Sequence, residues 1–479
     1  MGSDFKPRLL PDQYLVSASD SKMDENEVQG DIVLGFRKRV QAFLLISITD
    51  LELFRRLLRD ILAPLLTSTA EVRAAAGLIG AIKAYAPPGT LKPFTSTQLA
   101  FSARALLHLG IPAEALPAQG AFRAGQAHDA RINLADPVES GKLAHWRPQY
   151  ENASIDGLLT VTAPDSTQLE LELGFLRNVI APATKIVLEL KSAVRPGSAA
   201  GKEHFGYKDG VSNPRVAGME PMGNQAGEGR AVDASVIITG LKAGQPSWTR
   251  NGSFLVFREL QQLVPEFDAF CHSSGKISKP DEIGARLMGR WKSGAPVSLS
   301  PHTDDLKLAS AQGFDYADPA ELKQARCPYV AHIRKANPRN GLGNRKELID
   351  PHLMIRASIP YGPEVSQDER DSNATKQERG LFFICYQSSI EAGFQFVQKV
   401  WCNNQKFPSN EAGIDPGFDL IVGQNYGKSR TAQNVIDKGV QGDNDPLNTV
   451  TTNIQFVVPK GGEYFFVPSI STVRNTLGA

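Results

Sequence analysis

The stretch GLLTVTAPDSTQLELELGFLRNVIAPATKIVLEL, residues 157–190, decides the fold class of this chain. Its first part, GLLTVTA, is apolar and β-rich, and residues 185–190 form a second strand-like run. The apolar residues of 164–180 recur at helical spacing, and Asp165 or Ser166 is the candidate N-cap. The stretch therefore predicts a strand, a helix and a strand in succession.

Two more strands and a helix are expected before this unit. RVQAFLLISI at 39–48 and STQLAFS at 96–102 are typical of strands. Residues 50–66 have apolar side chains at helical spacing, with Asp50 as the candidate N-cap. The order up to residue 190 is then β-α-β-β-α-β, which is the split βαβ or ferredoxin-like arrangement.

The C-terminal half repeats this pattern without repeating the sequence. Strands are expected at 252–260, 352–359, 379–387 and 463–469. One helix is expected after the first of these strands and another at 389–401. Long insertions separate these pieces. The expected fold class is α+β, with two ferredoxin-like domains whose antiparallel sheets pack together.

The two units set the expected domain boundaries. We expect an N-terminal tail at 1–27 and a first domain at 28–217 that ends with a glycine-containing loop. A linker is expected at 218–232, where glycine is frequent and no periodicity is present. The second domain then occupies 233–479.

Composition and charge exclude several classes of protein. The formal net charge is +1, which gives no reason to expect a nucleic acid or an anionic membrane as partner. No run of about 18 apolar residues predicts a membrane-spanning helix. The four cysteines form no CxxC pair, so neither a zinc site nor a disulfide scaffold is indicated, and Cys385 is expected to be a buried thiol.

Three Asn-x-Ser/Thr sequons occur, at Asn152, Asn251 and Asn373. Short sequons arise by chance, so they favour secretion only weakly. The first residues, MGSDFKPRLL, have no apolar core of the kind that a signal peptide needs. Either the protein is not secreted by the usual route, or a signal has been removed and a start added. We expect an extracellular rather than a cytoplasmic location.

One loop-like stretch carries candidate chemistry. In EHFGYKDGVSNP, residues 203–214, Asp209 is followed by a glycine and preceded by Gly206 and two aromatic residues. The glycines permit a tight turn with positive φ. An Asp-Gly pair is most often a surface turn, but the apolar neighbours favour a loop that lies against a flat hydrophobic ligand.

Two further stretches contain candidate residues. In RCPYVAHIRKANPR, residues 326–339, His332 is surrounded by apolar residues and followed by several cations. It is either a structural histidine or part of a site for a ligand with carboxylates. In DPHLMIRASIPYG, residues 350–362, Arg356 interrupts an apolar run, so it faces either a polar cavity or solvent at a sheet edge.

In this order, the three stretches resemble the dye-decolorizing peroxidase family of haem enzymes. The family hallmark GxxDG is present at 206–210, the haem-ligand histidine corresponds to His332, and the distal arginine before PYG corresponds to Arg356. The resemblance extends from residue 29 to residue 471. The long insertions and the chain ending resemble those of fungal members. The resemblance implies two ferredoxin-like domains with one haem b in the C-terminal domain.

The resemblance also implies roles for individual residues. His332 would bind the haem iron, and a carboxylate would hydrogen-bond its other ring nitrogen. Asp419 is the best match for that carboxylate, and Asp415 is the rival. On the opposite face of the haem, Asp209 would move the peroxide proton and Arg356 would stabilise the developing charge.

Other pocket residues follow from the same resemblance. Leu381 and Phe383 match the apolar residues of the distal face, and their alternative role is ordinary core packing. Arg334 and Arg339 are candidates for binding the haem propionates. His204 is a second candidate ligand, but it lies too close to Asp209 in the sequence to reach the opposite face.

The implied reaction uses hydrogen peroxide to oxidise dyes, phenols and other bulky aromatic compounds through a ferryl intermediate. Because aspartate has a lower reference pKa than histidine, an aspartate base predicts an acidic pH optimum. Tyr361 and Trp401 match positions that carry electrons from the surface in fungal members, although most such side chains only pack. Mn²⁺ oxidation is a further possibility, because acidic residues cluster after Tyr361: Glu364, Asp368, Glu369 and Asp371. A solvated acidic loop is the simpler interpretation of this cluster.

Two other classes of protein remain open from the sequence. A non-catalytic haem carrier would need His332 but neither Asp209 nor Arg356. A haem-processing enzyme on the same fold would have no use for the aromatic residues Tyr361 and Trp401.

Overall fold

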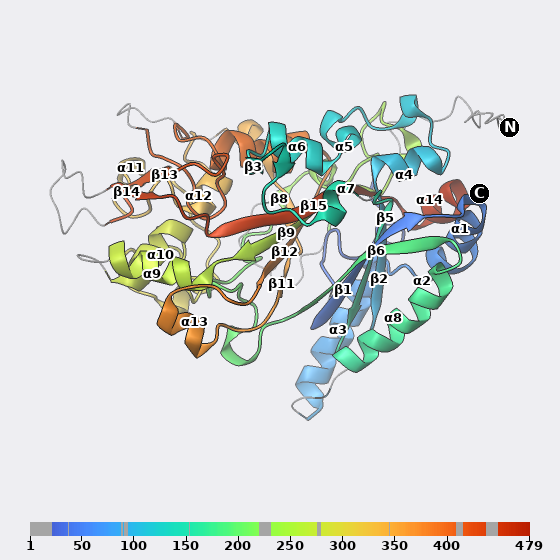
Figure 1. Ribbon diagram of the computed structural model, residues 1–479, viewed down its shortest axis with the longest axis horizontal. Coiled ribbons are helices and arrows are strands. Elements are labelled where there is room, and N and C mark those ends of the chain that lie inside the picture. Colours follow the sequence, from blue (N-terminus) through green and yellow to red (C-terminus); the bar gives the residue numbers. More distant parts are fainter. Residues whose placement is uncertain are drawn as a thin grey trace.

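A nine-stranded antiparallel sheet organises the whole chain (Figure 1). The strand order is β10-β12-β9-β15-β2-β5-β1-β6, and β11 also pairs with β12. The computed structural model describes residues 22–36, 38–87, 90, 94–152, 154–219, 231–274, 279–343, 345–408, 415–436 and 449–479.

The N-terminal half has the predicted ferredoxin-like order. Its strands are β1 (Val40–Ile48), β2 (Ser96–Phe101), β5 (Gly157–Ala163) and β6 (Thr184–Ala193). They lie in the order β2-β5-β1-β6, and all of their pairings are antiparallel. The helical segments of this half are α1 (Leu51–Leu57), a π-helical turn (Leu58–Leu62), α2 (Ala63–Leu65), α3 (Thr69–Tyr85), α4 (Ala103–His108), α5 (Gly120–Ala124), α6 (Gln126–Ile132), α7 (Pro148–Asn152) and α8 (Ser166–Ile180).

The local sequence explains why α8 forms where it does. The Asp165 side chain accepts a hydrogen bond from the backbone N–H of Gln168 at 2.9 Å, which caps the first turn. The buried residues of α8 lie along one face at helical spacing: Leu169, Leu173, Leu176 and Ile180. Asp50 caps α1 in the same way, as predicted from the sequence.

The C-terminal half repeats the arrangement. Its strands are β9 (Ser253–Gln262), β10 (Ile355–Arg356), β11 (Ile359–Tyr361), β12 (Gly380–Gln387) and β15 (Val457–Val467). The order β10/β11-β12-β9-β15 matches that of the first half, so the pattern repeat is confirmed. The α-helices of this half are α9 (Val264–Ser274), α10 (Pro280–Met288), α11 (Pro319–Leu322), α12 (His332–Ala336), α13 (Gln367–Ser372) and α14 (Ile470–Thr472), and π-helical turns lie at Glu391–Gln395, Val397–Cys402 and Val473–Leu477. Short strands elsewhere in the chain are β3 (Val138–Glu139), β4 (Lys142–Leu143), β7 (Arg215–Val216), β8 (Ala231–Val232), β13 (Arg430–Gln433) and β14 (Thr449–Thr452).

The expected single strand at 352–359 is wrong in detail. The structure divides it into β10 and β11, with Ala357 and Ser358 between them. The backbone N–H of Ile384 in β12 donates to the Ser358 hydroxyl at 3.3 Å. A side-chain oxygen therefore takes the place of a backbone partner, and the regular pairing is interrupted there.

The two half-sheets join along one edge and pack across their inner faces. Phe101 of β2 pairs with Phe466 of β15, which links the halves into one sheet. Phe43 of β1 contacts Phe257 of β9 and Phe382 of β12, with ring centroids 5.1 and 5.3 Å apart. Because β11 also lies against β6, the sheet curves into a barrel-like core. This confirms the expected packing of the two sheets.

Strand β12 separates this core from the rest of the C-terminal half. Phe382 faces the inner core, and Tyr386 donates a hydrogen bond to the buried Asp31 at 2.8 Å. Leu381 and Phe383 point to the opposite face, because side chains alternate along a strand. That opposite face is where the candidate site lies.

The segments at the predicted domain boundaries contact other parts of the chain. The Glu27 carbonyl accepts from the backbone N–H of Ile470, so the residues before the first domain contact the end of the chain. Strands β7 and β8 pair in parallel at the two sides of the expected linker, most of which lies outside the described residues. The domain boundaries stay a prediction.

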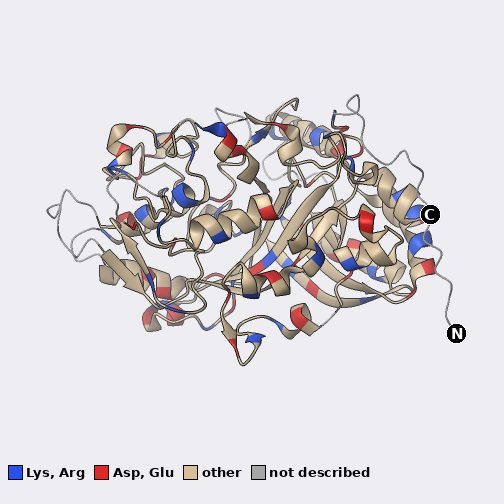
Figure 2. Cartoon of the chain, turned by 90° about the horizontal axis from the view of Figure 1, so that it is seen from above, with Lys and Arg blue, Asp and Glu red and all other residues tan. Residues whose placement is uncertain are grey.

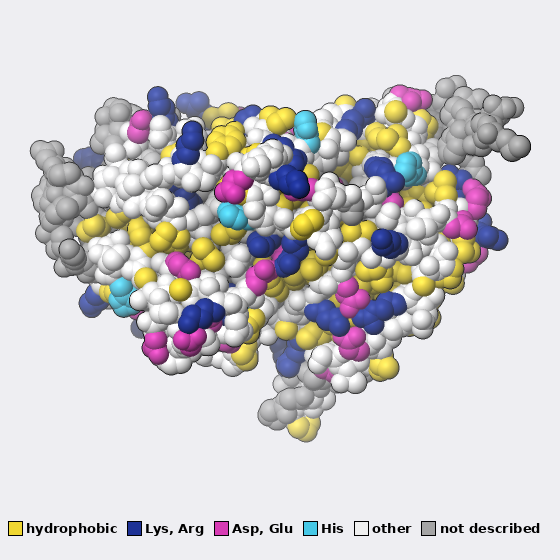
Figure 3. Space-filling model, in the orientation of Figure 1, with side chains coloured by type: hydrophobic (Ala, Val, Ile, Leu, Met, Phe, Trp, Pro, Cys, Tyr) yellow, Lys and Arg dark blue, Asp and Glu magenta, His cyan; other side chains and the backbone are white. Residues whose placement is uncertain are grey.

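Over the part of the chain that the structure describes, surface charge is mixed in sign. Figure 2 shows basic and acidic residues interspersed over the length of the molecule. On the face drawn in Figure 3, hydrophobic side chains occur in small groups among polar ones. None of the helices in the described ranges combines the length and the apolar character that membrane crossing requires. All four cysteines are free and buried, which includes Cys385 as predicted.

Candidate active site

The Asp209 loop is shaped by its glycines and by a buried carboxylate. Gly206 and Gly210 have φ of 96° and 72°, a region that disfavours other residues. The Glu203 carboxylate accepts from the backbone N–H groups of Phe205 and Tyr207, both at 2.8 Å. Burial raises the pKa of Glu203, although the hydrogen bonds from its neighbours oppose this. Both aromatic residues are buried, so they anchor the loop in the core.

Asp209 and Arg356 face each other across the entrance to a cavity. Arg356 Nε lies 3.7 Å from Asp209 Oδ1, and the two side chains are 29% and 31% exposed. The Gly210 N–H donates to Asp209 Oδ1 at 2.7 Å. The structure therefore brings together Asp209 and Arg356, which are 147 positions apart in the sequence. Both groups keep atoms accessible to a small polar molecule.

His332 begins helix α12, and its imidazole is oriented by Asp419. His332 Nδ1 lies 2.7 Å from Asp419 Oδ2. Asp419 is fully buried, and its Oδ1 accepts from the N–H groups of Ile421 and Val422. Burial acts to raise the pKa of Asp419, but the hydrogen bond from His332 and those from the two backbone N–H groups outweigh burial, so the pKa is lowered.

This geometry fixes which ring nitrogen of His332 is available. A carboxylate accepts a proton donor at Nδ1, so Nε2 keeps its lone pair and can bind a metal. Asp415, the rival partner, is exposed and is not in contact with the histidine. Asp419 therefore occupies the position expected of the orienting carboxylate.

Asp209, Arg356 and His332 line one cavity. It encloses about 1690 Å³ of space, part of which is open to solvent. The wall carries apolar side chains from several elements, among them Met288, Leu381, Phe383, Phe394, Val397, Ile421 and Val422. Apolar walls with a few convergent polar groups are typical of cofactor sites. The lone pair of His332 Nε2 and these walls fit a flat apolar macrocycle with a central metal.

The two candidate cations for propionate binding lie in different places. Arg339 lines the cavity and stacks over Phe314, with its guanidinium carbon 3.9 Å from the ring centre. Arg334 is buried elsewhere, where it pairs with Glu321 and lies over the ring of Tyr316. The structure therefore brings Arg339, and not Arg334, to the cavity.

Arg290 is a cavity residue that the sequence analysis missed. It is 3% exposed and its guanidinium lies 5.2 Å from the Phe314 ring centre, on the same ring as Arg339. Burial and the nearby charge of Arg339 lower the pKa of Arg290 to about 10, so it stays cationic near neutral pH. Nothing in the local sequence GRWKS marks this arginine, because its role depends on the fold around it.

Comparison with known proteins decides the family. The family described as "DyP dimeric alpha+beta barrel domain" matches residues 27–196, and that described as "Dyp-type peroxidase, C-terminal" matches residues 201–410. The chain belongs to the dye-decolorizing peroxidase family. It is a peroxidase enzyme, as the resemblance implied.

Relatives of this family cover nearly the whole chain. Dye-decolorizing peroxidase msp1 of Mycetinis scorodonius is 35% identical over 98% of this chain and 91% of its own length. A dye-decolorizing peroxidase of Auricularia auricula-judae is 34% identical over 98% of this chain and 90% of its own length. The structure of an ancestral D-type dye-decolorizing peroxidase matches with a TM-score of 0.85 at 39% identity, covering 95% of this chain and 100% of that one.

The two expected electron-transfer residues of this dye-decolorizing peroxidase are buried, so their description as surface residues needs correction. Tyr361 is 8% exposed and stacks on Phe382 of the inner core at 4.4 Å. Trp401 is 3% exposed and stacks on Phe407 at 5.4 Å. Trp401 also contacts His352, which lines the cavity, at 5.1 Å. Trp401 is thus separated from the cavity by one aromatic ring.

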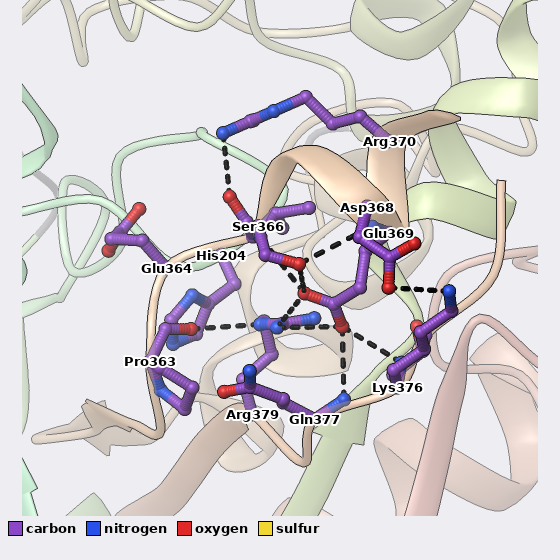
Figure 4. A network of polar contacts seen from close by, with 12 residues as sticks. His204, Pro363, Glu364, Ser366, Asp368, Glu369, Arg370, Lys376, Gln377 and Arg379 are labelled. Atoms are coloured by element: carbon purple, nitrogen blue, oxygen red, sulfur yellow. Dashed lines mark hydrogen bonds and ion pairs between the residues drawn. The ribbon is translucent and has the colours of Figure 1, made fainter. Parts of the chain in front are cut away.

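The acidic cluster considered for Mn²⁺ is already engaged by protein groups (Figure 4). Glu369 is fully buried and accepts from Arg379, from the Ser366 hydroxyl and from three backbone N–H groups. Glu364 pairs with Arg195, and Asp368 pairs with Lys376. Within the described ranges, no group of three or more His, Cys, Asp or Glu residues is arranged to hold a metal ion.

His204 is not oriented as an iron ligand. Its Nε2 lies 2.8 Å from the Tyr361 carbonyl oxygen, and it is not among the residues that line the cavity. Burial and the charge of Arg195 lower the pKa of His204 to about 4. A neutral, buried histidine between the Asp209 loop and β11 has a structural role.

Proposed function

We propose that this peroxidase binds one haem b in the cavity through His332 and uses hydrogen peroxide to oxidise dyes, phenols and other bulky aromatic compounds. The observation that carries the proposal is the arrangement of two polar pairs around one apolar cavity. The His332–Asp419 pair offers a metal ligand, and the Asp209–Arg356 pair offers proton transfer and charge stabilisation.

The His332–Asp419 pair supports strong donation to a metal. The Asp419 carboxylate accepts the Nδ1 proton and increases the electron density of the imidazole. Because the Ile421 and Val422 N–H groups also hold this carboxylate, the ring cannot rotate easily. Bound haem would supply the two-electron redox chemistry of peroxide reduction.

The Asp209–Arg356 pair supports cleavage of the peroxide O–O bond. The Asp209 carboxylate accepts the proton of one peroxide oxygen and returns it to the other oxygen, which leaves as water. The Arg356 guanidinium stabilises the negative charge on the departing oxygen. The 3.7 Å separation of the two groups allows one peroxide molecule to contact both.

We infer that bulky substrates give up their electrons outside the cavity, and the contacts of Trp401 support a route for these electrons. The Trp401 indole contacts His352, which lines the cavity. It also stacks on Phe407, which belongs to the segment 403–408. Tyr361 is a second relay candidate without a cavity contact. A Trp401→Phe variant should slow oxidation of a bulky dye much more than oxidation of a small phenol, and equal slowing of both in steady-state assays would argue against the relay.

The decisive experiment follows peroxide addition to the haem-loaded protein by stopped-flow absorbance. The native protein should react rapidly, and Asp209→Asn should react on the order of 10² to 10⁴ times more slowly, which is the usual contribution of a general acid–base. Rapid reaction of both proteins would assign proton transfer to another group. No reaction of either would favour the haem-carrier alternative.

We further propose that the protein is extracellular. Two of its three sequons, Asn152 and Asn373, are exposed, whereas Asn251 is 5% exposed and accepts a hydrogen bond from Asp24. Glycosidase treatment of protein from the native host should reduce its apparent mass. An unchanged mass would remove this support.

A further inference from the structure

The backbone of Arg356 is held by the side chain of one residue from the Asp209 loop. The Arg356 N–H donates to Asn213 Oδ1 at 3.0 Å, and Asn213 Nδ2 donates to the Arg356 carbonyl at 2.8 Å. Asn213 lies only four positions after Asp209. One amide side chain therefore joins the loop of the carboxylate to the strand of the guanidinium.

The position of Arg356 in the sheet explains why this contact is needed. Strand β10 is two residues long and lies at the end of the strand order, where it pairs with β12. The next residue, Ala357, donates its N–H to Ile384 of β12, so the N–H and carbonyl of Arg356 point away from that strand. The Asn213 amide presents one acceptor and one donor, as the backbone of a neighbouring strand would.

A second side chain fixes the same stretch of backbone. Lys38 Nζ donates to the Ala357 carbonyl at 2.5 Å. Lys38 enters from the N-terminal half, and Asn213 comes from the loop that follows it. A smaller cavity beside the main one is lined by Lys38, Asp209, Asn213 and Arg356, so these side chains share one space.

We propose that Asn213 is a positioning residue for peroxide activation, because it sets the placement of Arg356 relative to Asp209. The inference rests on the proposed roles of these two residues. A reacting group that is misplaced by about 1 Å can lower a rate by about a hundredfold. The amide transmits any movement of the Asp209 loop to the Arg356 backbone, so that the pair moves as a unit.

Two substitutions of Asn213 separate positioning from general folding. Asn213→Ala removes both hydrogen bonds. Asn213→Asp keeps the acceptor at neutral pH but loses the donor and places a negative charge near the Arg356 carbonyl. When that carboxyl is protonated, below about pH 4, it again offers one donor and one acceptor. Recovery of function in acid is therefore specific to the two-bond contact.

Asn251→Ala is the control for loss of stability, because it removes a buried amide that accepts a hydrogen bond from a backbone N–H and places an alanine at a φ of 59°. Asn251 lines none of the cavities that Asp209 and Arg356 line. Three quantities are measured for each haem-loaded variant: the rate constant for reaction with peroxide, the dissociation constant of fluoride, and the midpoint of thermal unfolding. Fluoride is a non-reacting anion that accepts hydrogen bonds from donors near the metal.

We expect Asn213→Ala to react with peroxide about ten to a hundred times more slowly and to bind fluoride more weakly. Its unfolding midpoint should fall no more than that of Asn251→Ala, whose peroxide and fluoride constants should stay native. Asn213→Asp should be slow at neutral pH, and its rate relative to the native protein at the same pH should rise as the pH falls below about 4.

Native peroxide and fluoride constants in Asn213→Ala would overturn the inference. The inference would also fail if Asn251→Ala lost as much activity as Asn213→Ala when the two variants lose the same stability. It would fail as well if the peroxide rate of Asn213→Asp did not recover in acid. Asp209→Asn is measured alongside. A slow Asp209→Asn with a native Asn213→Ala overturns only the role of Asn213, whereas a native rate in Asp209→Asn overturns the proposed base and the inference with it.

Discussion

At the scale of single residues, the two carboxylates of the cavity differ in burial and in their number of hydrogen bonds. Asp419 is fully buried and its oxygens accept from His332 and from two backbone N–H groups. The Asp209 side chain is 31% exposed, and it accepts a hydrogen bond from the Gly210 N–H within its own loop. In the first arrangement protein groups occupy both carboxylate oxygens, and in the second the carboxylate stays accessible to a small molecule.

This contrast leads to a prediction for Asp419. In Asp419→Asn the His332 ring loses its anionic partner and donates less electron density to a bound metal. We expect the peroxide reaction of the haem-loaded variant to slow by about ten- to a hundredfold, the usual effect of removing such a partner. The reduction potential of the bound iron should rise, which a spectroelectrochemical titration measures.

Asp415→Asn is the control for this prediction. Asp415 is exposed and only four positions away, so the variant has the same change of charge in the same segment. Its potential and its peroxide reaction should remain native. If both variants shifted the potential equally, the effect would be one of general charge and not of the His332 contact.

The residues that form the candidate site were partly predictable from the sequence. Asp209, His332 and Arg356 lie in short motifs that are recognisable only when all three occur in this order, and the structure places the three residues on one cavity. Asn213, Arg290 and His352 gain their positions from contacts with segments far away in the chain, which no local pattern encodes. For the same reason, the sequence could not reveal that Trp401 is buried or that Arg334 faces away from the cavity.

At the scale of secondary-structure elements, helix α13 shows how a charged segment can be structural. Its N-terminus is capped by Ser366, and the Glu369 carboxylate accepts a hydrogen bond from the Ser366 N–H, which completes a capping box. The same carboxylate pairs with Arg379, and both side chains are fully buried. The acidic residues after Tyr361 therefore fix the connection from β11 to β12.

Glu369→Gln tests this role through its pH dependence. The hydrogen bond from Arg379 lowers the pKa of Glu369 against the opposing effect of burial, and the N–H groups of Ser366, Lys376 and Gln377 lower it further. A lowered folded-state pKa stabilises the protein above the unfolded-state pKa of about 4.3, and the contribution is lost as the pH falls through the folded-state value. The variant also leaves Arg379 buried without its partner.

We therefore expect Glu369→Gln to cost about 3 kcal/mol near pH 7 and progressively less below about pH 4. The midpoint of chemical denaturation at several pH values measures the difference. Asp368→Asn is the neighbouring control, since its side chain is 73% exposed and its pair with Lys376 is at the surface. A constant difference between Glu369→Gln and the native protein down to pH 3 would contradict the assignment.

Elements with a regular period were predictable, and those without one were not. The strands and α8 follow from alternation, helical spacing and the Asp165 cap. Helices α3 to α7 were missed as a group, and the strand at 352–359 was expected to be continuous. The hydroxyl of Ser358 interrupts it through a contact with β12, which depends on tertiary structure.

At the scale of the whole molecule, the two halves share one core. Phe43 belongs to the N-terminal half, and its ring contacts Phe257 and Phe382 of the C-terminal half. The π-helical turn Val473–Leu477 also returns to the N-terminal half, where it contacts the π-helical turn Leu58–Leu62. The repeat of two ferredoxin-like units was predictable from the sequence, but their fusion into one curved sheet was not. No sequence pattern indicates which strand of one unit pairs with which strand of the other.

The shared core predicts one cooperative unfolding transition. Phe43→Ala should lower the stability by about 3 to 5 kcal/mol and should weaken haem retention, because β12 carries both the core contact and the cavity wall. Differential scanning calorimetry should show one transition for both proteins. Phe175→Ala, at a ring that is 48% exposed on α8, should leave the midpoint nearly unchanged. Two separate transitions in the native protein would show that the halves fold independently.

The position of β15 in the sheet has a consequence for how the enzyme is made. This strand is contributed by residues 457–467, yet it lies between β9 and β2, and Val457 and Pro459 complete the cavity wall. Until residues 457–467 have been synthesised and have joined the sheet, the pocket lacks one side and the two halves lack their seam. The pocket is therefore completed late in synthesis, when β15 inserts between two strands that were made before it.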